Sequence, residues 1–305
     1  MRVFLTGATG FVGSAIVQEL TGAGHQVLGL ARTEEAARSL VSAGAEAHRG
    51  DINDADSLRS GAADADGVIH TAFNHDFSKF KASSEIDRRV IETLGSALVG
   101  SDRPLIVTSA IGLLKQGSLA TEEDMPLSGS NPRIASEEAA DLVGSHRVNV
   151  SVVRLAPSVH GDGDHAFLAT LIRIAREKGE SAYIGDGLNY WPAVHRLDAA
   201  QLFRLVLEGA PAPGTRLHGV AEEAVVFGEI AKIIGRRLNV PLVSKSPEEA
   251  VDHFGWFAYF AAMHIRASSK QTRERLGWSP VRPGLLADLD RDSYFASQKV
   301  LSKMA

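Results

Sequence analysis

Three glycines near the start of the chain are spaced so that they could bind an anionic group. The segment Thr6–Gly13 reads TGATGFVG and follows an apolar, strand-like run. Gly7 allows a tight turn, Gly10 removes a Cβ where a pyrophosphate must approach, and Gly13 lets the following helix pack closely. Free N–H groups and the helix dipole then face the anion. The spacing predicts a pyrophosphate cradle for a nicotinamide dinucleotide, and no Gly-Lys-Ser/Thr follows to indicate a P-loop.

The residues after the second predicted strand, Gln26–Ala31, indicate which dinucleotide binds. An acidic residue here would accept hydrogen bonds from the adenosine ribose and repel a 2′-phosphate, but this chain has Arg32. Arginine pairs with a phosphate dianion through charge-assisted hydrogen bonds. NADP(H) is therefore the favoured cofactor, while Glu34 and Glu35 weaken the preference and leave NAD(H) as an alternative.

Alternating strand-like and helix-like segments must position these residues. Short β-rich runs alternate with segments whose apolar residues recur at helical spacing, as Val12, Ile16 and Leu20 do. This alternation predicts an α/β fold of the Rossmann type, a doubly wound parallel sheet with helices on both faces. The expected strands are Val3–Thr6, Gln26–Ala31, Ala45–Arg49, Gly67–Thr71, Pro104–Ser109 and Val150–Leu155. The expected helices are Phe11–Thr21, Glu34–Ala43, Asp54–Ala62, Glu85–Val99 and Ala135–His146, with Thr33 and Asp54 as N-caps.

The pattern loosens after Leu155, where glycine–aspartate turn signals interrupt it. Helices are expected at Phe167–Lys178, Asp198–Glu208, Gly228–Leu238 and Ser268–Leu276. We interpret residues 1–157, together with 194–222, as a dinucleotide-binding domain. Residues 158–305 are interpreted as a smaller, C-terminal substrate-binding lobe.

The composition excludes several classes of protein. The chain has 305 residues, a net charge of −5 and no cysteine, so disulfides, thiolate metal sites and thiol nucleophiles are excluded. Without a block of Lys and Arg, nucleic acid is a poor candidate partner. No apolar run reaches the ~18 residues of a membrane span, and the opening does not read as a signal peptide. We therefore expect a cytoplasmic protein that contacts neither membrane nor nucleic acid.

Further motifs follow in order along nearly the whole chain. They include Gly-x-x-Gly-x-x-Gly at the start, Arg154–Pro157 followed by His160-Gly161, Val194–Ala200, and Leu276–Pro280 with the sequence LGWSP. In these motifs the chain resembles the extended and atypical branch of the short-chain dehydrogenase/reductase superfamily, which includes NAD-dependent epimerases and dehydratases. The resemblance implies a homodimer through the helices Glu85–Val99 and Ala135–His146.

The resemblance also implies roles for individual residues. Asp51 and Ile52, after the third strand, match the family's adenine-contacting segment, and Ser109 matches the active-site serine at the end of the fifth strand. The expected cofactor contacts are Gly7, Thr9, Gly10, Phe11, Val12, Gly13, Arg32, Asp51, Ile52, Thr71, Ala72, Phe73, Glu137 and Pro157.

One departure from the family pattern puts the chemistry in doubt. The superfamily uses a Tyr as proton donor and a Lys four residues later, but none of the four tyrosines here is followed by such a lysine. Arg133 falls at the Tyr position and Glu137 at the Lys position. Arg133 is a poor proton donor, yet it can stabilise an oxyanion electrostatically. Glu137 could accept hydrogen bonds from ribose hydroxyls but cannot supply the missing positive charge.

The loss of this pair does not rule out catalysis. Positioning two reactants can contribute about 7–11 kcal/mol, whereas a positioned acid contributes roughly 10²–10⁴-fold in rate. A site that holds a carbonyl against the nicotinamide could thus remain a reductase. Ser109 or water could supply the proton, as could one of the histidines His75, His160 and His195.

Three functions stay open on these grounds. The leading prediction is an NADP(H)-dependent oxidoreductase that transfers hydride to a small carbonyl substrate, with Ser109 and Arg133 as catalytic residues. The alternatives are a sugar-nucleotide epimerase or dehydratase, and a non-catalytic NADP(H)-binding redox sensor. No metal site is expected, since HGDGDH at 160–165 matches neither an EF-hand nor a His-Glu-x-x-His helix.

An aromatic-rich run stands out in a chain that is only 6% aromatic. Residues 254–260 read FGWFAYF. They could pack in the core of the C-terminal lobe, form an apolar wall of the substrate pocket, or make a dimer contact. Together with Trp191, they favour a hydrophobic or aromatic substrate.

Overall fold

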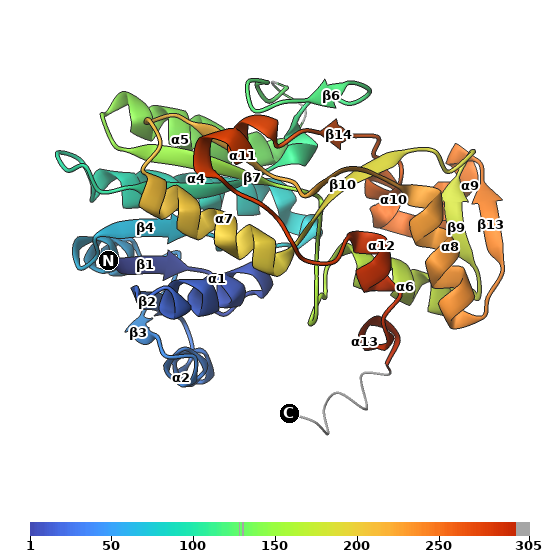
Figure 1. Ribbon diagram of the computed structural model, residues 1–305, viewed down its shortest axis with the longest axis horizontal. Helices are drawn as coiled ribbons and strands as arrows, with labels where there is room; N and C mark the ends of the chain where they lie inside the picture. The colour runs from blue at the N-terminus through green and yellow to red at the C-terminus, as the bar shows by residue number, and fades with distance from the viewer. Residues whose placement is uncertain (128, 130, 297–305) are drawn as a thin grey trace.

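Seven parallel strands form the central sheet of the computed structural model, which describes residues 1–127, 129 and 131–296 (Figure 1). The strand order β11-β7-β5-β4-β1-β2-β3 places β1 between β4 and β2. The predicted Rossmann-type sheet is therefore confirmed. The strands are β1 (Arg2–Thr6), β2 (Gln26–Ala31), β3 (Glu46–Arg49), β4 (Gly67–His70), β5 (Leu105–Ala110), β7 (Val150–Leu155) and β11 (Arg216–Gly219).

Helices cover both faces of this sheet because alternate side chains of each strand point to opposite faces. In β1, Val3 and Leu5 pack with buried residues of α1, α2 and α7, whereas Phe4 packs with α3, α4 and α5. The side chains of Val3, Phe4 and Leu5 are all fully buried. The covering helices are α1 (Phe11–Gly22), α2 (Glu34–Ser42), α3 (Ala55–Ala63), α4 (Phe80–Ser96), α5 (Ala135–Ser145) and α7 (Arg196–Gly209).

A second lobe lies beyond the carboxyl ends of the strands, on the right in Figure 1. It contains the small sheets β12-β10-β8 and β13-β9. Among the described residues, none of the helices in either lobe combines the length and hydrophobicity needed to cross a bilayer. The strands of the second lobe are β8 (Ser158–His160), β9 (Ser181–Ile184), β10 (Tyr190–His195), β12 (Glu222–Val226) and β13 (Leu242–Lys245). Its helices are α6 (Phe167–Lys178), α8 (Phe227–Leu238), α9 (Pro247–Phe254), α10 (Ala258–Ala261), α12 (Leu285–Leu289) and α13 (Asp292–Phe295).

Short elements complete the chain near the end of the sheet. The two-stranded sheet of β6 (Leu119–Ala120) and β14 (Arg266–Ala267) and the helix α11 (Lys270–Leu276) lie over the α5 side in Figure 1. The 3₁₀ turns are η1 (Phe77–Lys79), η2 (Ile111–Leu113), η3 (Pro132–Ile134) and η4 (Gly255–Phe257).

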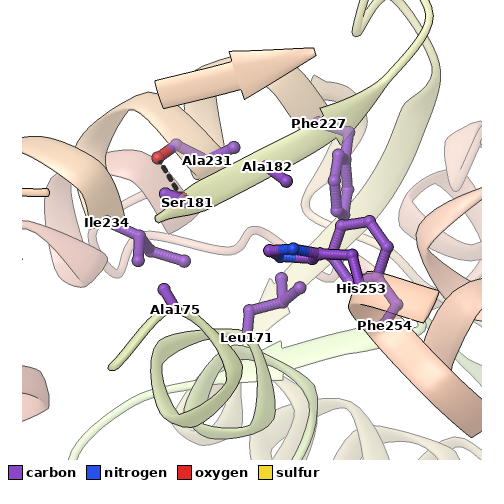
Figure 2. Close-up of a pocket in the computed structure, with 9 residues that line it drawn as sticks. All are labelled: Leu171, Ala175, Ser181, Ala182, Phe227, Ala231, Ile234, His253 and Phe254. Carbon is purple, nitrogen blue, oxygen red and sulfur yellow. Dashed lines mark hydrogen bonds between the residues drawn. The ribbon is translucent and has the colours of Figure 1, made fainter. Parts of the chain in front are cut away.

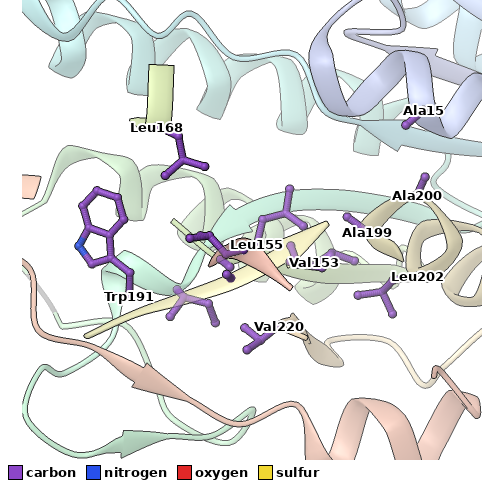
Figure 3. Packing of buried hydrophobic residues seen from close by; sticks show 14 of the residues in the cluster. Ala15, Val153, Leu155, Leu168, Trp191, Ala199, Ala200, Leu202 and Val220 are labelled. Carbon is purple, nitrogen blue, oxygen red and sulfur yellow. The ribbon is translucent and has the colours of Figure 1, made fainter. Parts of the chain in front are cut away.

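One apolar core joins the two lobes. Figure 3 follows it from Ala15 of α1, past Ala199 and Leu202 of α7, to Leu168 and Trp191 in the C-terminal lobe. Trp191 is 0% exposed and belongs to the same cluster as Ala15. Since this core is continuous, the C-terminal lobe is packed onto the sheet domain rather than tethered to it.

Most predicted elements of the first domain lie within two residues of their observed bounds, and the N-caps Thr33 and Asp54 are confirmed. The predicted start of helix Glu85–Val99 was wrong, because α4 begins at Phe80. Its first turns bury Ser83 and Ser84 rather than apolar side chains, so hydrophobic periodicity could not reveal them. The edge strand β11 was also not predicted.

The close packing of α1 against the loop after β1 depends on glycine. A Cβ added to Gly13 would lie 1.9 Å from the backbone oxygen of Gly7, which has a positive φ of 71°. Gly22, at the other end of the same helix, has no atom within 4 Å of an added Cβ. Substituting alanine at Gly13 and at Gly22 therefore separates the effect of steric contact from the effect of helix propensity.

We predict that Gly13→Ala lowers the free energy of unfolding by about 1–3 kcal/mol, because the new methyl group forces α1 away from β1. Gly22→Ala in the same helix is the matched control and should be neutral or stabilising by up to ~1 kcal/mol. Urea unfolding of both variants measures the difference. Equal stabilities would mean that α1 is not held at this distance.

Candidate functional site

The loop between β1 and α1 presents backbone N–H groups that no side chain occupies. Gly10 is the N-cap of α1 and has no side-chain capping bond, and its own N–H donates to the Gly7 oxygen at 2.9 Å. Thr9 and Gly10 are exposed, and Phe11 is half-buried. A Cβ on Gly7 would lie 2.7 Å from the backbone nitrogen of Ala72, so the loop also rests against the end of β4. These residues fit the diphosphate of a dinucleotide, whose approach a side chain would block.

The sheet topology sets where such a dinucleotide can lie. The chain runs outward from β1 through β2 to β3 on one side and from β4 to β5 on the other. Open α/β sheets bind ligands in the crevice formed at the carboxyl ends of the strands where the chain direction switches, and here that switch lies between β1 and β4. Predicted contacts fall on both sides of this point: Arg32, Asp51 and Ile52 on one, and Thr71, Ala72, Phe73 and Ser109 on the other.

An exposed cation lies at the end of β2. The Arg32 side chain is 79% exposed, and its Nε lies 4.0 Å from the nearest Asp51 oxygen. Asp51 also accepts a hydrogen bond from the Asn53 N–H at 2.8 Å. Glu34, the nearby carboxylate that weakened the NADP(H) expectation, lies 3.6 Å from Arg49 instead. The arrangement leaves Arg32 accessible to an anionic ligand.

Buried hydrogen bonds link the cradle strand to the neighbouring strand. The Thr6 hydroxyl and His70 Nδ1 are 2.6 Å apart, and His70 Nε2 lies 3.0 Å from Asp87 Oδ1 on α4. All three residues are at most 3% exposed. Thr71 donates from its hydroxyl to the Thr6 oxygen at 2.8 Å, which fixes the end of β4 against β1. The residues expected to flank the cofactor are thus held by a continuous polar network.

Arg133, which the resemblance predicts at the position of the family's Tyr, extends this network. Its Nη1 donates to Asp87 Oδ2 at 2.5 Å and contacts the Ser136 hydroxyl, and its Nη2 donates to the Thr108 oxygen at 3.0 Å. Its guanidinium lies 4.0 Å above the ring of Phe73. Burial alone would raise the pKa of Asp87, but the Arg133 charge and the His70 hydrogen bond hold that pKa well below its usual range. Asp87 is therefore a carboxylate that balances the charge of Arg133.

Glu137, which the resemblance predicts at the position of the family's Lys, forms a second buried network. It accepts two hydrogen bonds from Arg154, from Nε and Nη2, both at 2.8 Å. The Ser109 hydroxyl donates to it at 2.7 Å and Arg216 Nε at 3.1 Å. Burial would raise the pKa of Glu137, but the hydrogen bonds and charge of Arg154 outweigh this and lower it. The carboxylate thus orients Ser109, and both of its oxygens are already engaged within the protein.

Sequence reasoning singled out Ser109, Arg133 and Glu137 but missed the residues that hold them. Asp87 and Ser136 share Arg133 as a partner, and the Ser136 hydroxyl donates to Asp87 at 2.5 Å. Asp87 is 46 residues from Arg133, so no local spacing could have paired them. A carboxylate in the middle of the buried face of a helix was the one available signal.

The three candidate histidines lie in two different environments. His75 packs edge-on against Phe73 with ring centres 5.1 Å apart, and although its side chain is exposed, partial desolvation and the nearby Arg133 charge lower its pKa. His160 instead bonds Asp288 at 2.9 Å, and its ring packs against His195 at 5.3 Å. Of these three candidates, His75 is thus the one that lies beside the Arg133 network.

Pro157, the remaining predicted cofactor contact, lies half-buried between β7 and β8. Within residues 1–127, 129 and 131–296, no cluster of three or more His, Cys, Asp or Glu side chains has the arrangement of a metal site. With Pro157 included, the predicted cofactor contacts extend from the loop between β1 and α1 to the junction of the two lobes.

A small cavity in the C-terminal lobe is not part of this site. Figure 2 shows it between α6, β9, α8 and α9, with the His253 side chain at one side and the Ser181 hydroxyl bonded to the Ala231 oxygen. Its volume of about 10 Å³ is at the limit of what one water molecule needs. It can hold neither a cofactor nor a substrate.

Comparisons with known proteins agree with this geometry. Residues 7–170 match a family model described as NAD(P)H-binding. An uncharacterized protein of Schizosaccharomyces pombe is 49% identical over 97% of this chain and 100% of its own length. The 2-alkyl-3-oxoalkanoate reductase of Stenotrophomonas maltophilia is 26% identical, covering 81% of this chain and 78% of that protein.

Solved structures show the same fold. A dTDP-glucose 4,6-dehydratase from Streptomyces venezuelae with bound NAD is 20% identical, has a TM-score of 0.77, and covers 99% of this chain and 98% of its own. The expected resemblance to NAD-dependent epimerases and dehydratases is thereby confirmed at the level of fold. The family match spans more than half of the chain, and this protein belongs to the NAD(P)H-binding family.

Proposed function

We propose that this protein is an NADP(H)-dependent reductase that accepts a carbonyl substrate beside Ser109. The observation that carries the proposal is the position of Ser109 on β5, across the switch point from the cradle of β1. A dinucleotide whose diphosphate lies on α1 and whose adenosine lies toward Arg32 would direct its nicotinamide toward β4 and β5. The similarity to an oxoalkanoate reductase supports carbonyl chemistry.

The bound cofactor would supply the hydride, and the protein must supply a proton and a suitable electrostatic environment. Ser109 is the hydroxyl oriented by a buried carboxylate, with its hydrogen directed to Glu137 at 2.7 Å. Rotation of this O–H toward a developing alkoxide would leave Glu137 still paired with Arg154 and Arg216. A proton that Ser109 gives to the alkoxide must be replaced on its oxygen by a water molecule, which releases hydroxide to the solvent, so that no buried charge is left behind.

Arg133 has a more limited role than its charge suggests. Its Nη1 is engaged by Asp87 and its Nη2 by the Thr108 oxygen. In the proposed site, Arg133 fixes the residue before Ser109 and adds a positive potential near the carbonyl oxygen. Proton delivery then falls to Ser109, or to a water molecule held by it.

We predict that Arg32→Ala weakens NADPH binding by about tenfold or more, because a charge-assisted contact to the 2′-phosphate is lost. Binding of NADH should change by less than about twofold, since NADH has no such phosphate. Calorimetric titration of both nucleotides measures this, with Arg59→Ala, on the exposed face of α3, as control. Equal effects on the two nucleotides would contradict a role for Arg32 in the choice between them.

We also predict that Ser109→Ala lowers kcat for carbonyl reduction by roughly 10²-fold or more while leaving the Kd for NADPH within about twofold. Loss of NADPH absorbance with a panel of aldehydes, ketones and quinones gives the rate. Ser145→Ala is the control, because its exposed hydroxyl only caps the end of α5 through the Leu142 oxygen.

The same assay separates the rival functions. Absence of turnover across the whole panel, despite tight NADPH binding, would overturn the reductase proposal and favour a redox sensor. The observation that keeps the sensor in consideration is the buried pairing of Arg133 with Asp87 and of Glu137 with Arg154, at the positions where the resemblance expects Tyr and Lys.

A further inference from the structure

Aromatic side chains from both lobes meet in one group, here called the aromatic bridge. The sheet domain contributes Phe73, Phe77 and Phe80, from the segment that leads into α4. The C-terminal lobe contributes Phe167, Trp256 and Phe260. The joint between the lobes is a parallel stack of Phe77 on Trp256, with ring centres 5.0 Å apart and planes at 21°.

The aromatic bridge reaches the proposed reaction site. Phe73 packs on Phe80 at 6.1 Å, and its ring lies 4.0 Å below the Arg133 guanidinium. Arg133 in turn donates to the Thr108 oxygen, directly before Ser109. A series of contacts therefore runs from Trp256 in one lobe to the backbone oxygen of Thr108, the residue before Ser109.

Exposure separates this group from ordinary core. Of the run 254–260, Phe254 and Phe257 are buried and belong to the core of the lobe, as the packing interpretation expects. Trp256 and Tyr259, however, are 52% and 57% exposed. Phe257 and Trp191 pack against Phe167, with their ring centres 5.1 and 5.8 Å from its own. The group thus has a rigid, buried support and an accessible aromatic side, which is the form of a recognition surface.

The charges around the aromatic bridge indicate what it would accept. Within the part of the chain that the structure describes, Arg133 is the one cation stacked on a ring of the bridge, and Asp87 already balances it. The diphosphate of a nucleotide sugar would need unpaired cations, since a buried anion without them is costly. Aromatic faces instead favour flat, uncharged ligands through stacking and apolar burial.

We propose that the aromatic bridge is the substrate-recognition surface and that the substrate is a flat, uncharged aromatic carbonyl compound whose ring stacks on Trp256 and Phe77. This inference rests on the proposed reductase function. We place the carbonyl group of such a compound on the Phe73 side of the bridge, which leads to Arg133 and Thr108, and its ring on the Trp256 side.

The test compares 2-naphthaldehyde, a flat aromatic aldehyde, with decanal, an aliphatic aldehyde of similar size, using protein saturated with NADPH. Wild type should have a kcat/KM about two- to tenfold higher for 2-naphthaldehyde, the ratio expected from one stacking contact. Trp256→Ala and Phe77→Ala should each remove most of this preference, and Trp256→Phe should restore part of it. Phe295→Ala is the matched control. Phe295 is on α13, and its ring lies under the Arg237 guanidinium, outside the bridge.

A binding measurement keeps this inference separate from the reductase proposal. 2-Naphthol, which cannot be reduced by hydride transfer, should bind the NADP⁺ complex, and Trp256→Ala should weaken that binding by about tenfold. If no aldehyde is reduced but 2-naphthol binds in this way, the reductase function fails and the recognition surface stands. Equal kcat/KM values for the two aldehydes, 2-naphthol binding that is insensitive to Trp256, or displacement of 2-naphthol by UDP-glucose would each overturn the assignment.

Discussion

The ion pair between Arg154 and Glu137 is the interaction on which the proposed chemistry depends. Its side chains are 0% and 2% exposed, so neither charge is stabilised by water. Such a pair is tolerable only when every polar group has a partner. Arg154 also donates to the Asp124 oxygen at 2.8 Å, and Glu137 accepts from Arg216 and Ser109. Five segments are thereby tied to one point, and the direction of the Ser109 hydroxyl follows from it.

The second network gives the nucleotide cradle and the reaction site a common support. Thr6 ends the strand that carries the glycine loop, and it reaches Arg133 through His70 and Asp87. A shift of α4 or of the segment before α5 would therefore also displace the residues that hold the glycine loop. Because these contacts are buried and short, they restrain both ends of the crevice, as the alignment of a cofactor with its substrate requires.

Local signals in the sequence predicted the local structure well. The glycine spacing, the caps Thr33 and Asp54, and the helical and strand periodicities identified most of the sheet domain. What could not be predicted is pairing across long separations. Asp87 meets His70 and Arg133 from distances of 17 and 46 residues. A buried polar residue looks in sequence like an interruption of the apolar pattern, which is also why the start of α4 was missed.

If Arg133 and Glu137 stand where the resemblance expects Tyr and Lys, one position gains a positive charge and the other has its charge reversed. A Tyr–Lys pair works because the cation makes the phenol more acidic. Here each new charge has an opposite partner, Asp87 for Arg133 and Arg154 for Glu137, so neither acts as a free acid or base. Two uncharged groups lie next to these ion pairs: the buried hydroxyl of Ser109, and an imidazole of His75 whose pKa is lowered. A site of this kind suits a reaction driven by the position of its reactants, in which a hydroxyl or bound water gives up a proton only as negative charge develops on the substrate oxygen.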